Sequence, residues 1–227
     1  MQHPELLHLA GAGETVVRQG QTVVAIAVPE PDAPIVHRFV LEPDAKLLVR
    51  SFVRSGTSAE IRTELSGRGS EADLRAVAVS EGGRTARYVS RTESSASKTR
   101  ACSDVSAFAL KDGDLFVETV ASIGPGVSAG YAEAVQSNVL FGERAKVRGV
   151  PELRIASDDV KARHSCAVER FSEDRLFYLR SRGLTESEAT VSLLSAKTSL
   201  AFSGLPEGFD PLSETLCRSA LSAIVGK

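Results

Sequence analysis

The feature that most constrains this fold is a series of short runs of alternating or β-branched residues. Four of them are TVVAIAV (22–28), IVHRFVL (35–41), DLRAVAV (73–79) and DLFVETVAS (114–122). Alternation with a period of two is typical of β-strands. Up to about residue 180 such runs recur roughly every 10–13 residues, the spacing of an all-β sandwich, a barrel or a stacked β-helix.

The breaks between the runs favour the stacked β-helix. Two-residue hairpins use turns such as Asn-Gly or Asp-Gly, and Asp112–Gly113 is the one match in the chain. Most other breaks are bends rich in Gly or Ser, such as GRGSE and SEGGR. The sequence therefore predicts a mainly β fold built of successive strands and corners, although it has no strict repeat word.

Capping signals replace the alternating runs in the last part of the chain. Ser172 precedes the helical stretch EDRLFYLRSR. Thr185 and Glu188 have the spacing of a capping box at the start of a second helix, and DPLSETLCRSALSAIV is typical of a third. We expect a β-core over residues 1–171 and a C-terminal α-helical segment over residues 172–227.

Composition excludes several classes of function. Of 227 residues, 42% are apolar and 25% are charged, with a formal net charge of −2, which gives no preference for nucleic acid or an anionic membrane. No apolar run has the length of a bilayer span, and the first residues lack the pattern of a secretion signal. The three cysteines have no paired spacing, so we expect a cytoplasmic protein in a reducing environment.

Nucleotide-binding and metalloenzyme motifs are missing. The chain has no GxxxxGK[ST] phosphate loop and no GxGxxG, so we expect that it binds no nucleotide and that any ATP hydrolysis belongs to another chain. Asp158 and Asp159 are the one adjacent carboxylate pair with the character of a site. Neighbours on a strand point to opposite faces, so a solvated corner or a turn cap is the simpler interpretation. We therefore expect a chain that is not an enzyme.

His164 and Cys166 have the chemistry of metal ligands. On a strand they share one face with Ala162 and lie roughly 6.6 Å apart at the backbone, so both can reach one metal ion. Two ligands do not complete a site, and the others would come from another strand or subunit. An ordinary packed pair on a β-surface is the alternative. The other residues of these types carry no such signal: we expect Cys102 and Cys217 to be small buried apolar residues and His37 to be a strand residue with its polar edge satisfied.

The stretch ELRIASDDVKARHSCAV, followed by LFYLRSRGLTESEA, resembles the C-terminal part of the SufB/SufD family of iron–sulfur cluster assembly proteins. The family pattern is a strand ending in Asp-Val, a histidine four residues after the valine, an aromatic-rich FYL-SRG helix and an acidic helix start. The matching residues here are Asp159, Val160, His164, Phe177, Tyr178, Leu179, Ser181, Arg182 and Gly183. The resemblance extends over approximately residues 55–200.

The resemblance implies a right-handed parallel β-helix followed by helices that bind the SufC ATPase. It implies pairing with a SufB-like chain through the β-helices and a transient iron–sulfur cluster at that interface, with a cysteine desulfurase system acting indirectly. His164 is then a ligand of the cluster or of iron, or a polar contact of the partner's ligands, with Cys166 beside it. Glu186, Glu188 and Leu193 are the implied ATPase contacts.

Departures from the family pattern point to the SufD type. SufB-type members carry a cysteine at the position that matches Gln136, and glutamates where this chain has Arg163 and Ser165. SufD-type members share the DDVK stretch and the histidine and lack that cysteine, although they often carry a cysteine two residues before the histidine, where this chain has Ala162. The family's N-terminal helical region has no counterpart here, since the chain begins almost directly with strands. We expect a shortened SufD-like subunit in which Cys166 matches no ligand position of the family.

Three other interpretations remain open. The first is a self-paired homodimeric SUF scaffold. The second is a β-helix carbohydrate-active enzyme with Asp158 or Asp159 as acid or base; such sites stack sugars on aromatic rings, and aromatic residues are only 5% of this chain. The third is a purely structural β-solenoid.

Overall fold

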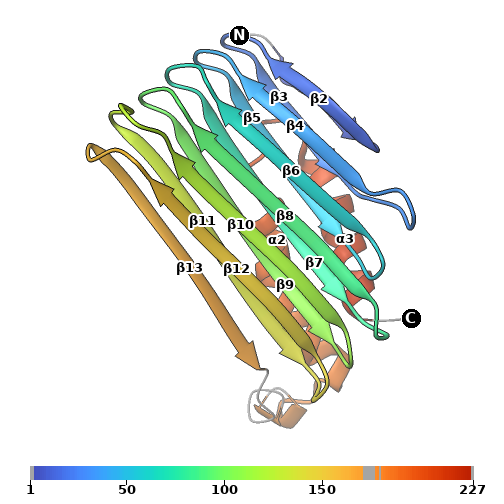
Figure 1. The fold of residues 1–227 in the computed structure, drawn as a ribbon. Helices are drawn as coiled ribbons and strands as arrows, with labels where there is room; N and C mark the ends of the chain where they lie inside the picture. The colour runs from blue at the N-terminus through green and yellow to red at the C-terminus, as the bar shows by residue number, and fades with distance from the viewer. Residues whose placement is uncertain (1–2, 171–176, 179, 226–227) are drawn as a thin grey trace.

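Two parallel β-sheets face each other, with a pair of helices on one outer side (Figure 1). The computed structural model describes residues 3–170, 177–178 and 180–225. The seven-stranded sheet has the order β1 (Glu5–Leu9), β3 (Thr22–Ala27), β5 (Lys46–Val53), β7 (Glu71–Ser80), β9 (Arg100–Leu110), β11 (Gly130–Phe141) and β13 (Val160–Arg170). The six-stranded sheet has the order β12 (Lys146–Ile155), β10 (Asp114–Ile123), β8 (Thr85–Ser94), β6 (Ser58–Leu65), β4 (Ile35–Leu41) and β2 (Ala12–Val17).

Successive strands alternate between the two sheets, and neighbours within each sheet are parallel. Two strands thus make one turn of a flattened coil, and each turn advances the chain by one strand spacing, about 4.8 Å. Parallel neighbours cannot be joined by tight hairpins. Asp112–Gly113, the one hairpin-like dipeptide, accordingly lies at the corner where the chain crosses from β9 to β10. The predicted β-solenoid is confirmed.

One corner of the solenoid repeats the same backbone conformation in successive turns. Gly20, Asp44, Gly69, Lys98 and Ala129 all have φ between 52° and 75°. The N–H group of each donates a hydrogen bond to a backbone carbonyl of the following turn, at 2.8–3.2 Å. A left-handed conformation costs a residue with a side chain about 1–2 kcal/mol. The stacked hydrogen bonds offset this cost for the lysine and the alanine.

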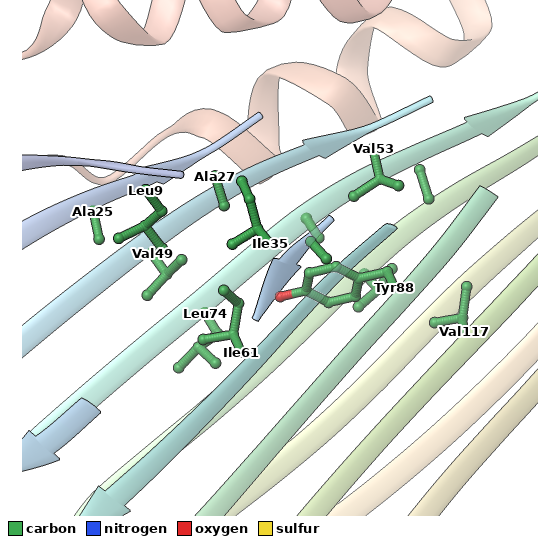
Figure 2. Packing of buried hydrophobic residues seen from close by; sticks show 14 of the residues in the cluster. Leu9, Ala25, Ala27, Ile35, Val49, Val53, Ile61, Leu74, Tyr88 and Val117 are labelled. Carbon is green, nitrogen blue, oxygen red and sulfur yellow. The ribbon is translucent and has the colours of Figure 1, made fainter. Parts of the chain in front are cut away.

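Small apolar side chains fill the space between the sheets (Figure 2). Alanine, valine and leucine from both sheets alternate along the interior, and Tyr88 is the largest aromatic residue that is fully buried among them. Burying a valine or leucine side chain stabilises a fold by about 1.5–3 kcal/mol. The low aromatic content therefore matches an interior that is only one side chain deep on each sheet.

The helices α2 (Glu186–Phe202) and α3 (Asp210–Val225) lie over the outer face of the seven-stranded sheet (Figure 1). The predicted capping box begins α2: Thr185 Oγ1 accepts a hydrogen bond from Glu188 N at 3.2 Å, and a Glu188 carboxylate oxygen accepts one from Thr185 N at 2.8 Å. Apolar residues of both layers form one cluster: Val24, Ile26, Phe52, Val77, Val79, Phe108, Leu110 and Val139 from the sheet, and Ala201, Phe202, Leu216 and Ala220 from the helices.

Some strands and helices of the structure differ from those expected from the sequence. β1 and β2 precede the first alternating run of the sequence analysis, at residues 22–28. Residues 145–149 and 152–157, whose pattern predicts two short strands, form the single strand β12. The helix expected after Ser172 lies partly outside the described residues, within which Phe177 and Tyr178 are helical and exposed. The domain boundary after residue 171 stays a prediction. Among the described residues, no helix combines the length and apolar character needed to cross a bilayer.

Candidate functional site at the end of the solenoid

The predicted ligand residues lie on β13, the last strand of the seven-stranded sheet. Within the described part of the chain, β13 pairs with β11 on one side and with no strand on the other. The parallel register places His164 beside Ala134 and Cys166 beside Gln136. Ala134 and Gln136 are buried between the sheets. His164 and Cys166 therefore belong to the inward-facing side, and they are exposed because no further turn of described residues covers them.

The thiol of Cys166 is held by two amide side chains of the preceding turn. Asn138 Nδ2 donates to Cys166 Sγ at 3.4 Å and to the carbonyl of Ala167 at 3.2 Å. The Cys166 thiol lies 3.5 Å from Gln136 Oε1, and Gln136 Nε2 donates to Thr119 Oγ1 at 2.9 Å across the solenoid. Although the residue as a whole is exposed, partial burial of its sulfur raises the pKa of Cys166, and the hydrogen bond from Asn138 opposes that rise.

Because Gly149 on β12 has no side chain, the Gln136 amide and the Cys166 sulfur can occupy the space beside its backbone. A Cβ atom at Gly149 would lie 2.7 Å from Gln136 Oε1 and 2.9 Å from Cys166 Sγ. The sulfur thus sits against bare backbone of the opposite sheet. Asn138 is 1% exposed, and its Oδ1 has no hydrogen-bond partner within the described structure. The last complete turn therefore has a polar interior that opens at β13.

His164 makes no hydrogen bond with any described residue, so both ring nitrogens are available to a ligand or a partner. The neighbouring outward-facing Arg163 is engaged instead, since its guanidinium pairs with the Glu133 carboxylate and lowers the pKa of that carboxyl. The described residues contain no cluster of three or more metal-ligating side chains. One imidazole and one thiol on a free strand edge can therefore supply at most half of a four-coordinate site.

The carboxylates considered as acid and base do not face each other on a strand. Asp158 and Asp159 lie in the bend before β13. An Asp159 carboxylate oxygen accepts a hydrogen bond from Ala129 N at 3.2 Å, next to the main-chain bond between the same residues. This is the turn cap that the sequence analysis favoured over a catalytic pair.

The three residues predicted as ATPase contacts lie at the start and in the middle of α2. Glu188 is exposed, and its carboxylate is occupied by the capping box with Thr185, which lowers the pKa of Glu188. The side chains of Glu186 and Leu193 lie outside the described part of the structure. Their role as contacts stays a prediction.

Two expectations for other residues need correction. Cys102 is half-buried on the outer face of β9 in a hollow with charged side chains, instead of lying in the apolar core, and burial raises its pKa to about 11. His37 has one satisfied nitrogen, with Nε2 2.9 Å from Thr15 Oγ1, while Nδ1 is buried without a partner among the described residues.

Sequence reasoning missed the residues that shape the site. Asn138 and Gly149 gave no signal, because their importance depends on which strands stack. Residues 126–130, GVSAG, have the spacing of the GxSxG nucleophile motif and were also overlooked. That motif requires a strand-to-helix turn, whereas Ser128 lies at a corner between strands with its hydroxyl on Ser97 Oγ at 3.1 Å.

The chain is similar in sequence to several known proteins. The model of the family described as "SUF system FeS cluster assembly, SufBD core domain" matches residues 22–197. The chain is 38% identical over 64 residues to the iron–sulfur cluster assembly protein SufD of Escherichia coli, covering 28% of this chain and 15% of that protein. It is 41% identical over 56 residues to a SufBD family protein of Mycobacterium bovis, covering 24% and 14%. A Synechocystis SufBD family protein aligns over 89 residues at 28% identity, covering 39% and 18%. Each match thus spans less than a fifth of the relative's length.

Proposed function

Because this chain belongs to the SufBD family, we propose that it is a SufD-like scaffold subunit in SUF iron–sulfur cluster assembly. It would pair with a SufB-like chain through the β12–β13 end of the solenoid. The observation that carries this proposal is the outer edge of β13, which pairs with no further strand among the described residues. His164 and Cys166 lie two residues apart on this strand and face the same side.

The donor set at this edge fits a shared site better than a complete one. Iron–sulfur clusters are normally held by thiolates, with histidine as an occasional replacement. This chain has Gln136 where SufB-type members carry a cysteine, and the amide serves to position Cys166. His164 would contribute an imidazole to a cluster that is the cargo of the complex, and the partner would contribute the thiolates. The raised pKa of Cys166 makes it the weaker donor at neutral pH, because a thiol must lose its proton to bind metal.

The helical pair is the proposed docking site of a SufC-like ATPase. The chain has no phosphate loop of its own, so the nucleotide would be bound and hydrolysed by that partner. A cysteine desulfurase system would supply sulfur without a direct contact. We place the complex in the cytoplasm, and the chain itself would be a scaffold and not an enzyme.

A self-paired homodimer is the second candidate, and the same edge favours it. Two copies joined at β13 would bring two imidazoles and two thiols to one seam. That set equals the two histidine and two cysteine ligands of Rieske-type clusters in number and kind.

Co-expression separates these assignments. The tagged chain is produced with a SufC-like ATPase and a SufB-like protein, and we expect both to co-purify with it. Recovery of the tagged chain alone would overturn the scaffold assignment, and recovery of a dimer of this chain with the ATPase would select the homodimer.

The ligand role has its own measurement in the same complex. His164→Ala should lower the iron and sulfide bound after reconstitution while leaving the complex assembled. Ser165→Ala, on the outward face of the same strand, is the matched control. Unchanged iron and sulfide in His164→Ala would remove the ligand role and leave the scaffold role standing.

A further inference from the structure

Arg50 is fully buried on the outer face of the seven-stranded sheet, beneath the helical pair. Its Nη1 donates to the carbonyls of Val49 and Asp73, both at 3.1 Å. Its Nη2 donates to Asp73 Oδ2 at 2.9 Å and to the carbonyl of Ser203 at 2.8 Å. Burial lowers the pKa of Arg50, and the Asp73 carboxylate opposes that shift. Four of the five N–H donors are thus satisfied, and one acceptor comes from Ser203, the C-cap residue that follows α2.

Arg75 on β7 makes a second set of bonds to the same helix end. Its Nη1 donates to the carbonyl of Leu200 at 3.0 Å and to Ser203 Oγ at 3.3 Å, while Nε donates to Asp73 Oδ1 at 3.1 Å. The single carboxylate of Asp73 therefore bridges the two guanidinium groups, Oδ2 to Arg50 and Oδ1 to Arg75.

The last turn of α2 contains no basic residue of its own. The carbonyls at a helix C-terminus carry partial negative charge and are stabilised by nearby cations. Here both cations come from the sheet, on adjacent strands β5 and β7. Gly204, with φ of 73°, then turns the chain away, and a Cβ atom at this position would lie 3.6–3.8 Å from nitrogens of the two guanidinium groups.

We propose that Arg50, Arg75 and Asp73 form a clamp that couples the α2–α3 pair to the solenoid, so that a partner that displaces the helices also moves β5 and β7. Apolar packing alone would let the helices slide, because hydrophobic contact is not directional. Hydrogen bonds from a buried guanidinium fix position, since leaving it unpaired in a buried site is strongly unfavourable. The helical pair is therefore a rigid extension of the sheet.

Hydrogen exchange on the full chain tests the clamp without any partner. In Arg50→Met, amides of α2 and α3 should exchange at least about tenfold faster, the worth of one charge-assisted hydrogen bond. Amides of β9 and β11 should not change. Arg62→Met is the matched control, because Arg62 is an exposed arginine of the six-stranded sheet that pairs with Glu60. Arg50→Lys should behave like Arg50→Met, since one ammonium group cannot reach acceptors on both layers.

Arg75→Met provides a second variant, with less risk to folding because its side chain is partly exposed. It should accelerate exchange at the C-terminal end of α2. If the amide hydrogen exchange of α2 and α3 is unchanged in both Arg50→Met and Arg75→Met, the clamp is overturned. Acceleration that is equal in all strands would also contradict it, since the arginines would then stabilise the whole fold.

The coupling itself is measured in the complex and rests on the proposed function. Nucleotide binding by the ATPase should alter exchange in β5 and β7 of the wild-type chain and not of Arg50→Met, with the ATPase still bound to both. An equal response of the two chains would contradict the coupling. Failure of the ATPase to bind the wild-type chain would count against the proposed function alone, because exchange in the isolated chain still decides the clamp.

Discussion

The Cys166 thiol and the Asn138 amide nitrogen lie 3.4 Å apart, and this hydrogen bond joins the last strand of the solenoid to the interior of the turn before it. Asn138 is almost completely buried, whereas Cys166 is exposed. The contact therefore opposes the rise in the pKa of Cys166 that burial causes, and so favours loss of the thiol proton at the open end.

Cysteine reactivity should follow this environment. Cys166 should react with iodoacetamide faster than Cys102 between about pH 7 and 9, because burial raises the pKa of Cys102 to about 11. Asn138→Leu removes the donor that lowers the pKa of Cys166, so its alkylation should slow. Peptide-level mass spectrometry measures each site, with Ser165→Ala as the control. Faster alkylation of Cys166 in Asn138→Leu would contradict the assigned role of the amide.

Substitution by alanine should affect stability differently at two glycines, Gly67 and Gly149. A Cβ atom at Gly67 would lie 2.0 Å from the backbone carbon of Glu42, whereas at Gly149 it would meet only side-chain ends. Gly67→Ala should therefore destabilise the fold by about 1–3 kcal/mol, as overpacking does. Gly149→Ala should cost less and should instead displace the Cys166 sulfur. Urea unfolding and the alkylation rate distinguish the two results, and equal stability losses would mean that the end of the solenoid is as rigid as its middle.

Because the hydroxyl of Tyr88 is buried, the stability of the wild-type protein should depend on pH differently from that of Tyr88→Phe. Burial raises the pKa of Tyr88 to about 12, above the value near 10 of an unfolded chain. Between about pH 10 and 12 the unfolded state releases this proton and the folded state keeps it, so wild-type stability falls as pH rises, by at most about 1.4 kcal/mol per pH unit. Tyr88→Phe removes that loss.

At pH 7 the same substitution should change the free energy of unfolding by less than about 1 kcal/mol. Among the described residues the hydroxyl makes no hydrogen bond of good geometry, and its interaction with Ser51 is weaker than the effect of burial on its pKa. Urea titrations of both proteins at pH 7 and pH 11 give the comparison. Other titrating groups cancel between the two proteins. If the wild-type protein loses no more free energy of unfolding than Tyr88→Phe between pH 7 and pH 11, the phenol is not buried as described.

Glu188 caps α2 and is also a proposed contact of the ATPase, and substitution can separate the two. Glu188→Gln keeps an acceptor for the Thr185 amide and should leave the helicity of α2 intact, while Thr185→Ala should cost about 1 kcal/mol through the lost cap. If the carboxylate charge contacts the ATPase, Glu188→Gln weakens that binding and Thr185→Ala does not. Circular dichroism and a binding titration measure both effects, and the reverse order would assign Glu188 to capping only.

The sequence predicted the local elements well, since strand alternation and capping boxes depend on residues that are close in the chain. β7 and β9 follow directly from their alternating patterns. The stacking of turns is not local, and this is why the sequence pointed to only part of the candidate site. His164 was predicted from its motif and stays a prediction, whereas Asn138 and Gly149 contact Cys166 only because β11, β12 and β13 meet at one end.

Arg50 illustrates the same limit on the outer face. In the run KLLVRSFV an arginine is typically a solvated outward-facing residue. It is fully buried because a segment that lies 153 residues further along the chain covers it. No pattern within the strand could indicate that cover.

The polarity of the solenoid also restricts how copies of it can associate. Its two ends are different surfaces: β13 and β12 at one end, β1 and β2 at the other. Joining like ends around a twofold axis stops at two chains, whereas joining unlike ends repeats, giving a closed ring where the rotation closes and an open filament where it does not. Only the twofold arrangement at β13 places His164 and Cys166 of two chains at one seam. In such a homodimer, the geometry that assembles the ligands is also the one that limits growth to a finite particle.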